Sequence, residues 1–334
     1  MRISKFIVTA DSHTEGMPTR VIVSGVPKLP GRSMAEKRDY FMKNLDYIRK
    51  MLSLEPRGHS AMHCAVITDP TVPEADVGVL FMYSEGYGDM CGHGTIGVVT
   101  TLLELGMIKA EEPVTEVVLD TPAGLVKARA LVRGGKVVSV TLRNMPSFTV
   151  ARGVTVDVPG AEGVRVDVAY GGNYFALVSA EDLGVGLQPS NLRKLVELGW
   201  LVWNEVSNKV KLSNPLNPSV LPHVTGTVIY IEASGGSHFR SIAVDGRNRF
   251  DRSPCGTGTS CLLALLYDTG KLRMGDEIVN ESIIGTKFRG KIVEEVTVGG
   301  LKAIIPEITG RAWITGIHHF VRDPEDPLKD GFMV

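Results

Sequence analysis

The chain has 334 residues, with 36 Lys and Arg against 37 Asp and Glu, so its formal net charge is −1 at pH 7. This balance gives no electrostatic basis for binding nucleic acid or an anionic membrane, and the longest apolar runs fall far short of the ~18 residues of a membrane span. Since the apolar stretch before Asp11 is too short for a signal peptide, we expect a cytoplasmic, enzyme-sized globular protein of two or three domains.

In chain order, β-branched runs predict strands at 5–10, 19–25, 63–68, 77–83, 116–122, 137–144, 164–172, 175–180, 226–233, 240–246 and 303–316. Two segments predict amphipathic helices, 36–52 and 191–207, because apolar residues recur in them at helical spacing. Many strand pairs are separated by short turns rather than helices. We therefore expect a mixed α/β fold with a mostly antiparallel sheet.

An internal repeat relates the segment that starts at Cys91 to the segment that starts at Cys255. CGHGTIGVVTTLLELGMIK aligns with CGTGTSCLLALLYDTGKLR, and both copies reach a glycine at the same position, Gly106 and Gly270. Each copy predicts a tight loop followed by a buried helix, and the glycine predicts where that helix ends. The repeat predicts two related lobes, each of which wraps its sheet around one central helix.

The start of a helix suits both a reactive cysteine and an anion. The first N–H groups of a helix have no internal partner and carry partial positive charge, and glycines let a ligand approach them closely. We expect the pKa of a cysteine held there to be lowered. Two such helix starts facing one another would bind a carboxylate with one sulfur on each face of its α-carbon. One cysteine would remove a proton as the thiolate and the other would return one as the thiol.

Several stretches resemble the proline racemase family over the whole length of the chain. MCGHGTIG (90–97) and DRSPCGTGTS (251–260) match its two cysteine loops, and its other recurrent stretches resemble DSHTEGMPTRV (11–21), EPRGH (55–59), YGGNYFALV (170–178) and ITGIHHFVRDPEDP (314–327). The resemblance implies a cofactor-independent, two-base racemase or epimerase of proline or 4-hydroxyproline. It also implies a fold like that of diaminopimelate epimerase, with the site in a cleft between two pseudo-symmetric lobes.

The resemblance further implies where the lobes divide and how they assemble. Residues 1–130 and about 308–334 would form the first lobe, which carries Cys91, and residues 131–307 would form the second, which carries Cys255. Family members are commonly dimers, so a homodimer is a further expectation.

Site residues follow from the same resemblance. Gly92, His93, Gly256 and Thr257 would contact the substrate carboxylate and ring nitrogen. Asp251 would accept a hydrogen bond from the secondary ammonium. His223 would line the ring pocket, with His238 as its competitor, and Gly94 favours 4-hydroxyproline over proline.

Other interpretations remain for these residues. Asp251 could cap the turn that follows it or pair with Arg252. Cys64 and Cys261 are expected in the core, and EPRGH is expected to brace the loops of the first lobe. His318 and His319 have no third ligand at a suitable spacing, so no metal site is expected. Neither helix-opening loop carries a lysine, which argues against pyridoxal phosphate.

Two other functions stay open beside the racemase. A lyase acting on trans-3-hydroxyproline would carry threonine in place of the second cysteine, and Cys255 argues against it. A binder of pyrrolidine carboxylates without catalytic activity is the third possibility.

Overall fold

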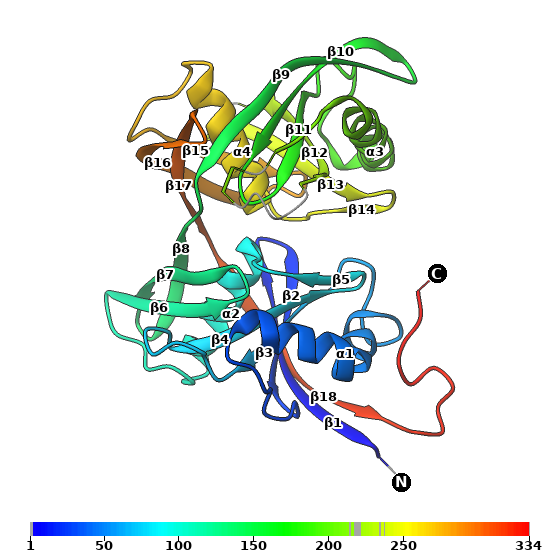
Figure 1. Cartoon of the computed structure of the whole chain (residues 1–334), viewed down its shortest axis with the longest axis vertical. Helices are drawn as coiled ribbons and strands as arrows, with labels where there is room; N and C mark the ends of the chain where they lie inside the picture. Colours follow the sequence, from blue (N-terminus) through cyan, green and yellow to red (C-terminus); the bar gives the residue numbers. More distant parts are fainter. Residues whose placement is uncertain (1–2, 214, 217–221, 234, 237, 334) are drawn as a thin grey trace. The chain divides into compact units, whose positions relative to one another are not determined.

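The computed structural model describes residues 3–213, 215–216, 222–233, 235–236 and 238–333. The chain divides into two compact units, residues 1–142 with 310–334, and residues 143–309 (Figure 1). The sequence placed the first division at 130. It lies later because β7 and β8 form a hairpin whose pairing runs on to Leu142.

Within its described residues, the first unit contains two helices and a set of mostly antiparallel strands. In chain order these are β1 (Lys5–Thr14), β2 (Met17–Ser24), α1 (Met34–Ser53), β3 (His63–Thr68), β4 (Val77–Tyr83), β5 (Gly86–Gly88), α2 (Gly92–Glu104), β6 (Val114–Thr121), β7 (Gly124–Arg133), β8 (Lys136–Arg143) and, from the end of the chain, β18 (Ala312–Arg322). β18 returns to pair antiparallel with β1 along its whole length.

The second unit repeats this order of elements. It comprises β9 (Ser147–Val158), β10 (Ala161–Tyr170), β11 (Tyr174–Ser179), the 3-10 turn η1 (Pro189–Asn191), α3 (Leu192–Lys209), β12 (Val224–Glu232), β13 (Phe239–Gly246), β14 (Arg249–Phe250), α4 (Gly256–Asp268), β15 (Glu277–Ser282), β16 (Lys287–Val298) and β17 (Leu301–Gly310).

The strand pairings confirm that the two units are related. β2 runs parallel to β3 across α1, and β11 runs parallel to β12 across α3. The central helix of each unit, α2 in the first and α4 in the second, lies in the chain between the strands of another parallel pair. These pairs are β4 with β6 and β13 with β15. The repeat seen around the two cysteines therefore extends to the whole α/β unit.

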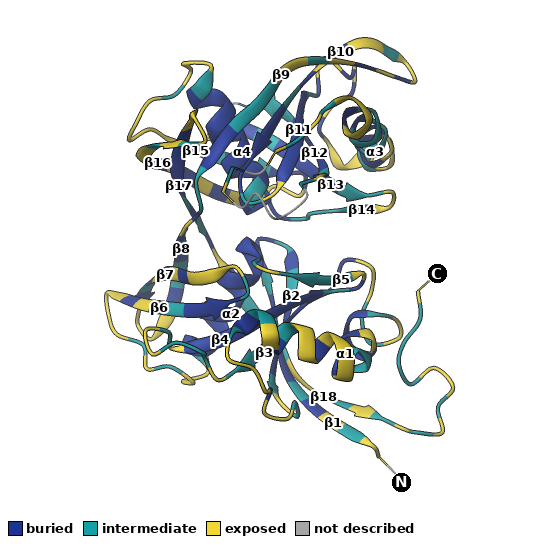
Figure 2. Ribbon diagram, viewed as in Figure 1, coloured by how far each residue is buried: buried dark blue, intermediate teal, exposed yellow. Residues whose placement is uncertain are grey.

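The two central helices are the most buried elements of their units. Every residue of α2 from Gly92 to Leu103 is buried, and so is almost all of α4 (Figure 2). α2 packs on β1, β2 and β18, and α4 packs on β9, β10 and β16. Burial on all sides explains why both sequences are apolar around the whole helix.

α2 and α4 end in the same way, with the same hydrogen bond at the glycine that follows each helix. Gly106 and Gly270 adopt φ of +68° and +73°. Each glycine N–H donates to a carbonyl of the last turn, Leu103 in α2 and Tyr267 in α4. This left-handed cap is the one that glycine favours, so the predicted helix ends are confirmed.

The outer helices are amphipathic, as the sequence predicted for 36–52 and 191–207. Ser33 caps the start of α1, and its Oγ accepts from the Glu36 N–H. Its buried side chains include Phe41, Leu45, Ile48 and Leu52, and its other face is exposed (Figure 2). Each outer helix therefore covers its sheet with a single apolar face.

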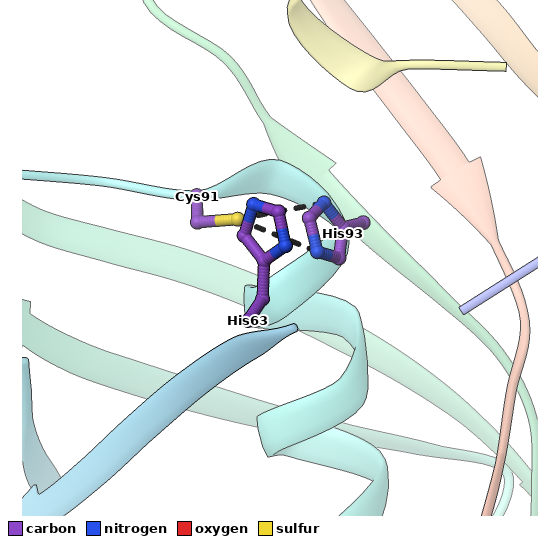
Figure 3. A group of neighbouring side chains, drawn as sticks. All are labelled: His63, Cys91 and His93. Atoms are coloured by element: carbon purple, nitrogen blue, oxygen red, sulfur yellow. Dashed lines mark hydrogen bonds between the residues drawn. The ribbon is translucent and has the colours of Figure 1, made fainter. Parts of the chain in front are cut away.

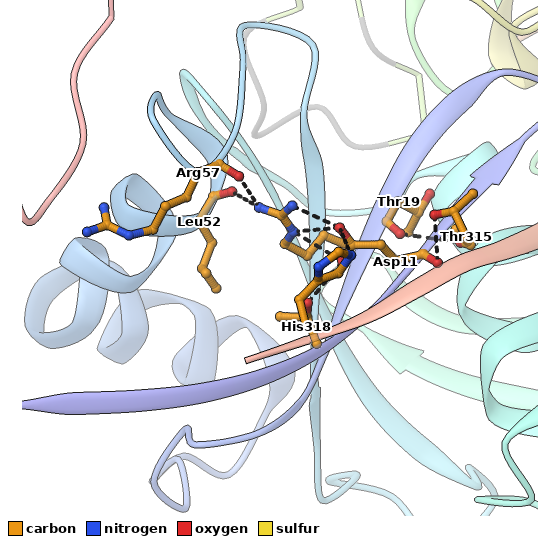
Figure 4. A network of polar contacts seen from close by, with 9 residues as sticks. Asp11, Thr19, Leu52, Arg57, Thr315 and His318 are labelled. Carbon is orange, nitrogen blue, oxygen red and sulfur yellow. Dashed lines mark hydrogen bonds and ion pairs between the residues drawn. The ribbon is translucent and has the colours of Figure 1, made fainter. Parts of the chain in front are cut away.

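A buried ion pair ties the start of the first unit to its other loops. The Arg20 guanidinium contacts the Asp11 carboxylate at 2.8 Å and donates through Nη1 to the carbonyls of Leu52 and Arg57 (Figure 4). His318 Nε2 lies 3.6 Å from the same carboxylate. The EPRGH segment therefore braces the loops of this unit, as the sequence indicated.

Asp11→Asn is expected to lower the free energy of unfolding by about 3–5 kcal/mol, because it leaves the Arg20 charge buried without its partner. Equilibrium urea denaturation measures this change. Lys28→Gln is the matched control: it breaks the pair between Lys28 and Asp69, whose side chains are 86% and 67% exposed, and should cost less than about 1 kcal/mol. Equal effects of the two substitutions would contradict this role for the buried pair.

Candidate active site

Cys91 directly precedes α2 in the first unit and is the N-cap residue of that helix. Its backbone is extended, with φ −144°, and the first hydrogen bond of the helix runs from the Thr95 N–H to the Cys91 carbonyl. The N–H groups of Gly92 and His93 belong to the first turn, where a helix offers donors to a ligand. The thiol itself is buried, with the residue 8% exposed.

Two imidazoles surround the Cys91 sulfur. Its Sγ lies 3.5 Å from Nδ1 and 3.8 Å from Nε2 of His93. His63, at the start of β3, places its ring 4.5 Å from the His93 ring at an angle of 80° (Figure 3). Burial lowers the pKa of His93 to about 4, so the ring is neutral.

Cys255 occupies the equivalent residue of α4 but adopts a different backbone conformation. Its φ is +61°, which is uncommon for a residue with a side chain. This conformation turns the sulfur back over the helix, where it accepts from the Gly258 N–H at 3.3 Å and lies 3.5 Å from Thr257 Oγ1. Unusual backbone angles of this kind concentrate at functional sites.

Asp251 lies close to this second cysteine. Its Oδ1 accepts from the N–H and the hydroxyl of Ser253, both at 2.8 Å, and Ser253 Oγ in turn accepts from the Cys255 N–H. The turn-capping role considered for Asp251 is therefore present. Arg252 instead packs its guanidinium over the Phe250 ring.

The surroundings of Cys255 contradict the expected direction of its pKa shift. A lowered pKa was predicted for cysteines at helix starts, but the pKa of Cys255 is raised well above its usual range. Burial is the largest cause and the Asp251 carboxylate the second, and together they outweigh the hydrogen bonds from Thr257 and Gly258. Cys255 is therefore a neutral thiol at neutral pH.

Burial also raises the pKa of Asp251 to about 6, against the opposing hydrogen bonds from Ser253. Because this carboxyl group holds its proton more tightly in the folded chain than in the unfolded chain, it stabilises the fold fully below about pH 4 and loses that contribution as the pH rises through 6.

In the Asp251→Asn variant the side chain at this position does not titrate. Its free energy of unfolding, relative to the wild type, should therefore rise by up to about 3 kcal/mol between pH 4 and pH 7. A constant difference over that range, measured by urea denaturation, would contradict the raised pKa.

A glycine lies directly beneath each sulfur. A Cβ on Gly94 would lie 3.0 Å from Cys91 Sγ and 2.9 Å from the Phe81 ring. A Cβ on Gly258 would lie 3.2 Å from Cys255 Sγ and 2.9 Å from Val228. The second glycine of each Cys-Gly-x-Gly motif therefore makes room for the cysteine side chain.

The two other histidines expected near a ligand belong to the second unit. His223 is exposed and directly precedes β12. His238 makes one backbone and one side-chain hydrogen bond to Val279 of β15: its N–H donates to the Val279 carbonyl, and its Nδ1 accepts from the Val279 N–H. Both the backbone and the side chain of His238 therefore hold it against β15.

The two other cysteines lie in the core, as predicted. Cys64 is 1% exposed, and Cys261 is fully buried with its thiol donating to the Ala169 carbonyl. Neither shares the position of Cys91 or Cys255 at a helix start.

Sequence reasoning missed two residues of these loops. His63 belongs to a strand that begins far from Cys91 in sequence, and only the packing of β3 against α2 brings it close. Ser253 was visible in DRSPCG, and its position two residues after an aspartate could have indicated a turn in which Asp251 accepts from it.

These features define a class of protein in which a repeated α/β unit presents a buried cysteine at the first turn of each central helix. The chain belongs to the proline racemase family, whose pattern matches residues 9–333. The expected fold class, two related lobes that each wrap a sheet around a helix, is confirmed.

Relatives and solved structures agree with this assignment. The chain is 44% identical to the proline racemase of Clostridioides difficile and to the 4-hydroxyproline 2-epimerase of Streptosporangium roseum, over 100% of both chains in each case. Both relatives are named as isomerases. A trans-3-hydroxy-L-proline dehydratase of Bacillus thuringiensis is 37% identical over the same full lengths. The crystal structure of a hydroxyproline epimerase from Agrobacterium vitis, with bound trans-4-hydroxy-L-proline, matches with a TM-score of 0.91 and 36% identity, covering 100% of this chain and 96% of that one.

Among the described residues, no helix combines the length and the apolar character that a membrane span requires.

Proposed function

We propose that this protein is a two-base epimerase or racemase that inverts Cα of 4-hydroxyproline or proline, with Cys91 and Cys255 as its catalytic residues. The observation that carries the proposal is the equivalence of the two cysteines. Each stands at the same position of a repeated unit, at the first turn of a buried helix and above a glycine. The full-length similarity to relatives named for this reaction supports it.

In the proposed reaction, one cysteine removes the Cα proton as a thiolate while the other donates its thiol proton to the opposite face. The electron pair left by the Cα–H bond is delocalised into the substrate carboxylate, and that pair then forms the new Cα–H bond. The thiol and the thiolate have then exchanged places. Because the pKa of Cys255 is raised, the substrate-free enzyme would hold a thiol at Cys255.

The proposal gives the backbone a distinct role. N–H groups of Gly92, His93, Gly256 and Thr257 would bind the substrate carboxylate, where negative charge develops as the proton leaves. Asp251 would accept from the ring ammonium, and His223 would line the ring pocket. No cofactor takes part in these steps. The cytoplasmic location and the homodimer expected from the sequence stay predictions.

The test of the function is to incubate the protein, without added cofactor, with L-proline and separately with trans-4-hydroxy-L-proline while recording optical rotation. Loss or change of rotation with only the Cα epimer as product is expected. Formation of a pyrroline would instead favour the dehydratase, which the 37% identical Bacillus thuringiensis relative keeps as the second candidate. Binding with no product at all would favour a non-catalytic protein.

Gly94→Ala is expected to lower kcat about 100-fold, because the added Cβ displaces the Cys91 sulfur or the Phe81 ring, and a misplacement of about 1 Å is enough for such a loss. Gly86→Ala is the control: it lies in the same unit, and its added Cβ meets nothing within 4 Å. Initial epimerisation rates of the two variants, with thermal unfolding as a check of the fold, measure the difference. Similar rates for both would contradict the idea that Gly94 positions Cys91.

A further inference from the structure

The neighbourhood of Cys91 contains a set of three possible metal-donor atoms, of which the proposed epimerase reaction uses only the Cys91 sulfur. One ring nitrogen from each of His63 and His93 and the sulfur of Cys91 lie within 4.8 Å of one another (Figure 3). Cys91 and His93 are buried and His63 is partly buried. Its ring packs edge-on against both Tyr83 and His93, at 4.5 Å in each case.

These three donors are the ligand types that Zn²⁺ prefers. With Zn–S of about 2.3 Å and Zn–N of about 2.0–2.1 Å, a tetrahedral ion holds a sulfur and a nitrogen about 3.5 Å apart. The distance from Cys91 Sγ to His93 Nδ1 is already 3.5 Å. Coordination would require the two rings to rotate about their side-chain bonds until one nitrogen lone pair of each points to a position shared with the sulfur. Three protein ligands would leave the fourth position open.

The two imidazoles come from different elements, His63 from the start of β3 and His93 from the first turn of α2. Both elements belong to the same unit and pack on one another. The fold therefore brings the three donors close together before any ion arrives, which reduces the entropic cost of binding.

We propose that His63, Cys91 and His93 form a binding site for a thiophilic divalent cation, with Zn²⁺ as the ion tested, and that the bound ion inhibits the enzyme. The ion binds the Cys91 thiolate, which releases a proton if the thiol was present. A sulfur bonded to Zn²⁺ no longer removes or returns a proton at Cα. The inhibition rests on the proposed function, whereas the binding does not.

Co²⁺ is the spectroscopic probe for binding. A thiolate bonded to Co²⁺ gives a sulfur-to-metal charge-transfer band, and Zn²⁺ should displace Co²⁺ because it binds such sites more tightly. The wild type should give this band at one equivalent. Cys91→Ser should lose it, His63→Gln should weaken Co²⁺ binding at least about tenfold, and Cys255→Ser and Cys261→Ser should retain it. Mg²⁺, which prefers oxygen ligands, should neither bind nor compete.

Activity supplies the second measurement. Zn²⁺ should inhibit the wild type, and a chelator should restore its rate. His63→Gln should keep its turnover but need at least about ten times more Zn²⁺ for half-inhibition. If the band persists in Cys91→Ser, or if His63→Gln binds Co²⁺ as the wild type does, the proposed site is wrong. Binding as described in a protein without epimerase activity would preserve the site and overturn the proposed function. Epimerase activity that Zn²⁺ leaves unchanged would preserve the function and overturn the inhibition.

Discussion

Cys91→Ser and Cys255→Ser are each expected to lower the rate of epimerisation by at least about a thousandfold in both directions. Serine keeps the size of the side chain, but its hydroxyl is far less acidic than a thiol, so it can neither act as the base nor return a proton at a comparable rate. Because each direction of the reaction needs one base and one acid, a single substitution disables both. Chiral separation of the products from each enantiomer or epimer measures the two directions separately.

Cys261→Ser is the matched control for these variants. Cys261 lies in α4, the helix that Cys255 caps, and its thiol donates to the Ala169 and Asn173 carbonyls, acceptors that also suit a serine hydroxyl. Its turnover should stay within a fewfold of the wild type. An active Cys91→Ser or Cys255→Ser variant, with the control also active, would contradict the assignment of that cysteine as a catalytic residue.

Asp251→Asn is expected to weaken substrate binding by about 10- to 100-fold while preserving binding of pyrrole-2-carboxylate. Loss of a charged hydrogen bond to the ring ammonium costs about 1.5–3 kcal/mol. The planar inhibitor resembles the geometry of Cα in the transition state and carries no cationic nitrogen, so its binding depends less on this carboxylate. The amide Oδ1 of asparagine can still accept from Ser253, which should maintain the loop.

The measurement is the affinity of the wild type and of Asp251→Asn for substrate and for inhibitor, by calorimetry. Substrate affinity that hardly changes, together with loss of the inhibitor, would show that Asp251 serves only to hold the loop of Cys255. The same result would leave the two cysteines as candidates, because their roles do not depend on this carboxylate.

Much of the fold could be predicted from local patterns. The apolar repeat after Cys91 and Cys255 predicted both buried helices and their glycine ends, and the spacing of Phe41, Leu45 and Ile48 predicted α1. The missed strands include β7, β9, β15 and β16, and charged residues and glycines interrupt the apolar pattern of β7, β9 and β16. The run 303–316 was predicted as one strand, whereas β17 ends at Gly310 and β18 begins at Ala312. In β16 the first half alternates between exposed and buried positions, with Lys287, Arg289 and Lys291 on the exposed face.

Less of the site could be predicted, because its chemistry depends on contacts between distant segments. The sequence indicated a cysteine at each helix start and the helix charge that would stabilise a thiolate. It did not show the positive φ of Cys255, the burial of Cys255 or the closeness of the Asp251 carboxylate. Burial and that carboxylate reverse the expected direction of the pKa shift of Cys255. His63 reaches Cys91 only through the packing of β3 against α2, a contact that no local pattern encodes.

The most direct test of the proposed two-base reaction is proton exchange at Cα in deuterated water. Each reaction would be started from a single epimer of 4-hydroxyproline and stopped early, and the deuterium at Cα measured in both the product and the recovered substrate. Two opposed cysteines predict deuterium in the product from the first turnover, while the recovered substrate keeps its proton, because the base that removes a proton is not the acid that returns one. Equal entry of deuterium into both pools, or product that retains the original proton, would contradict the roles given to Cys91 and Cys255.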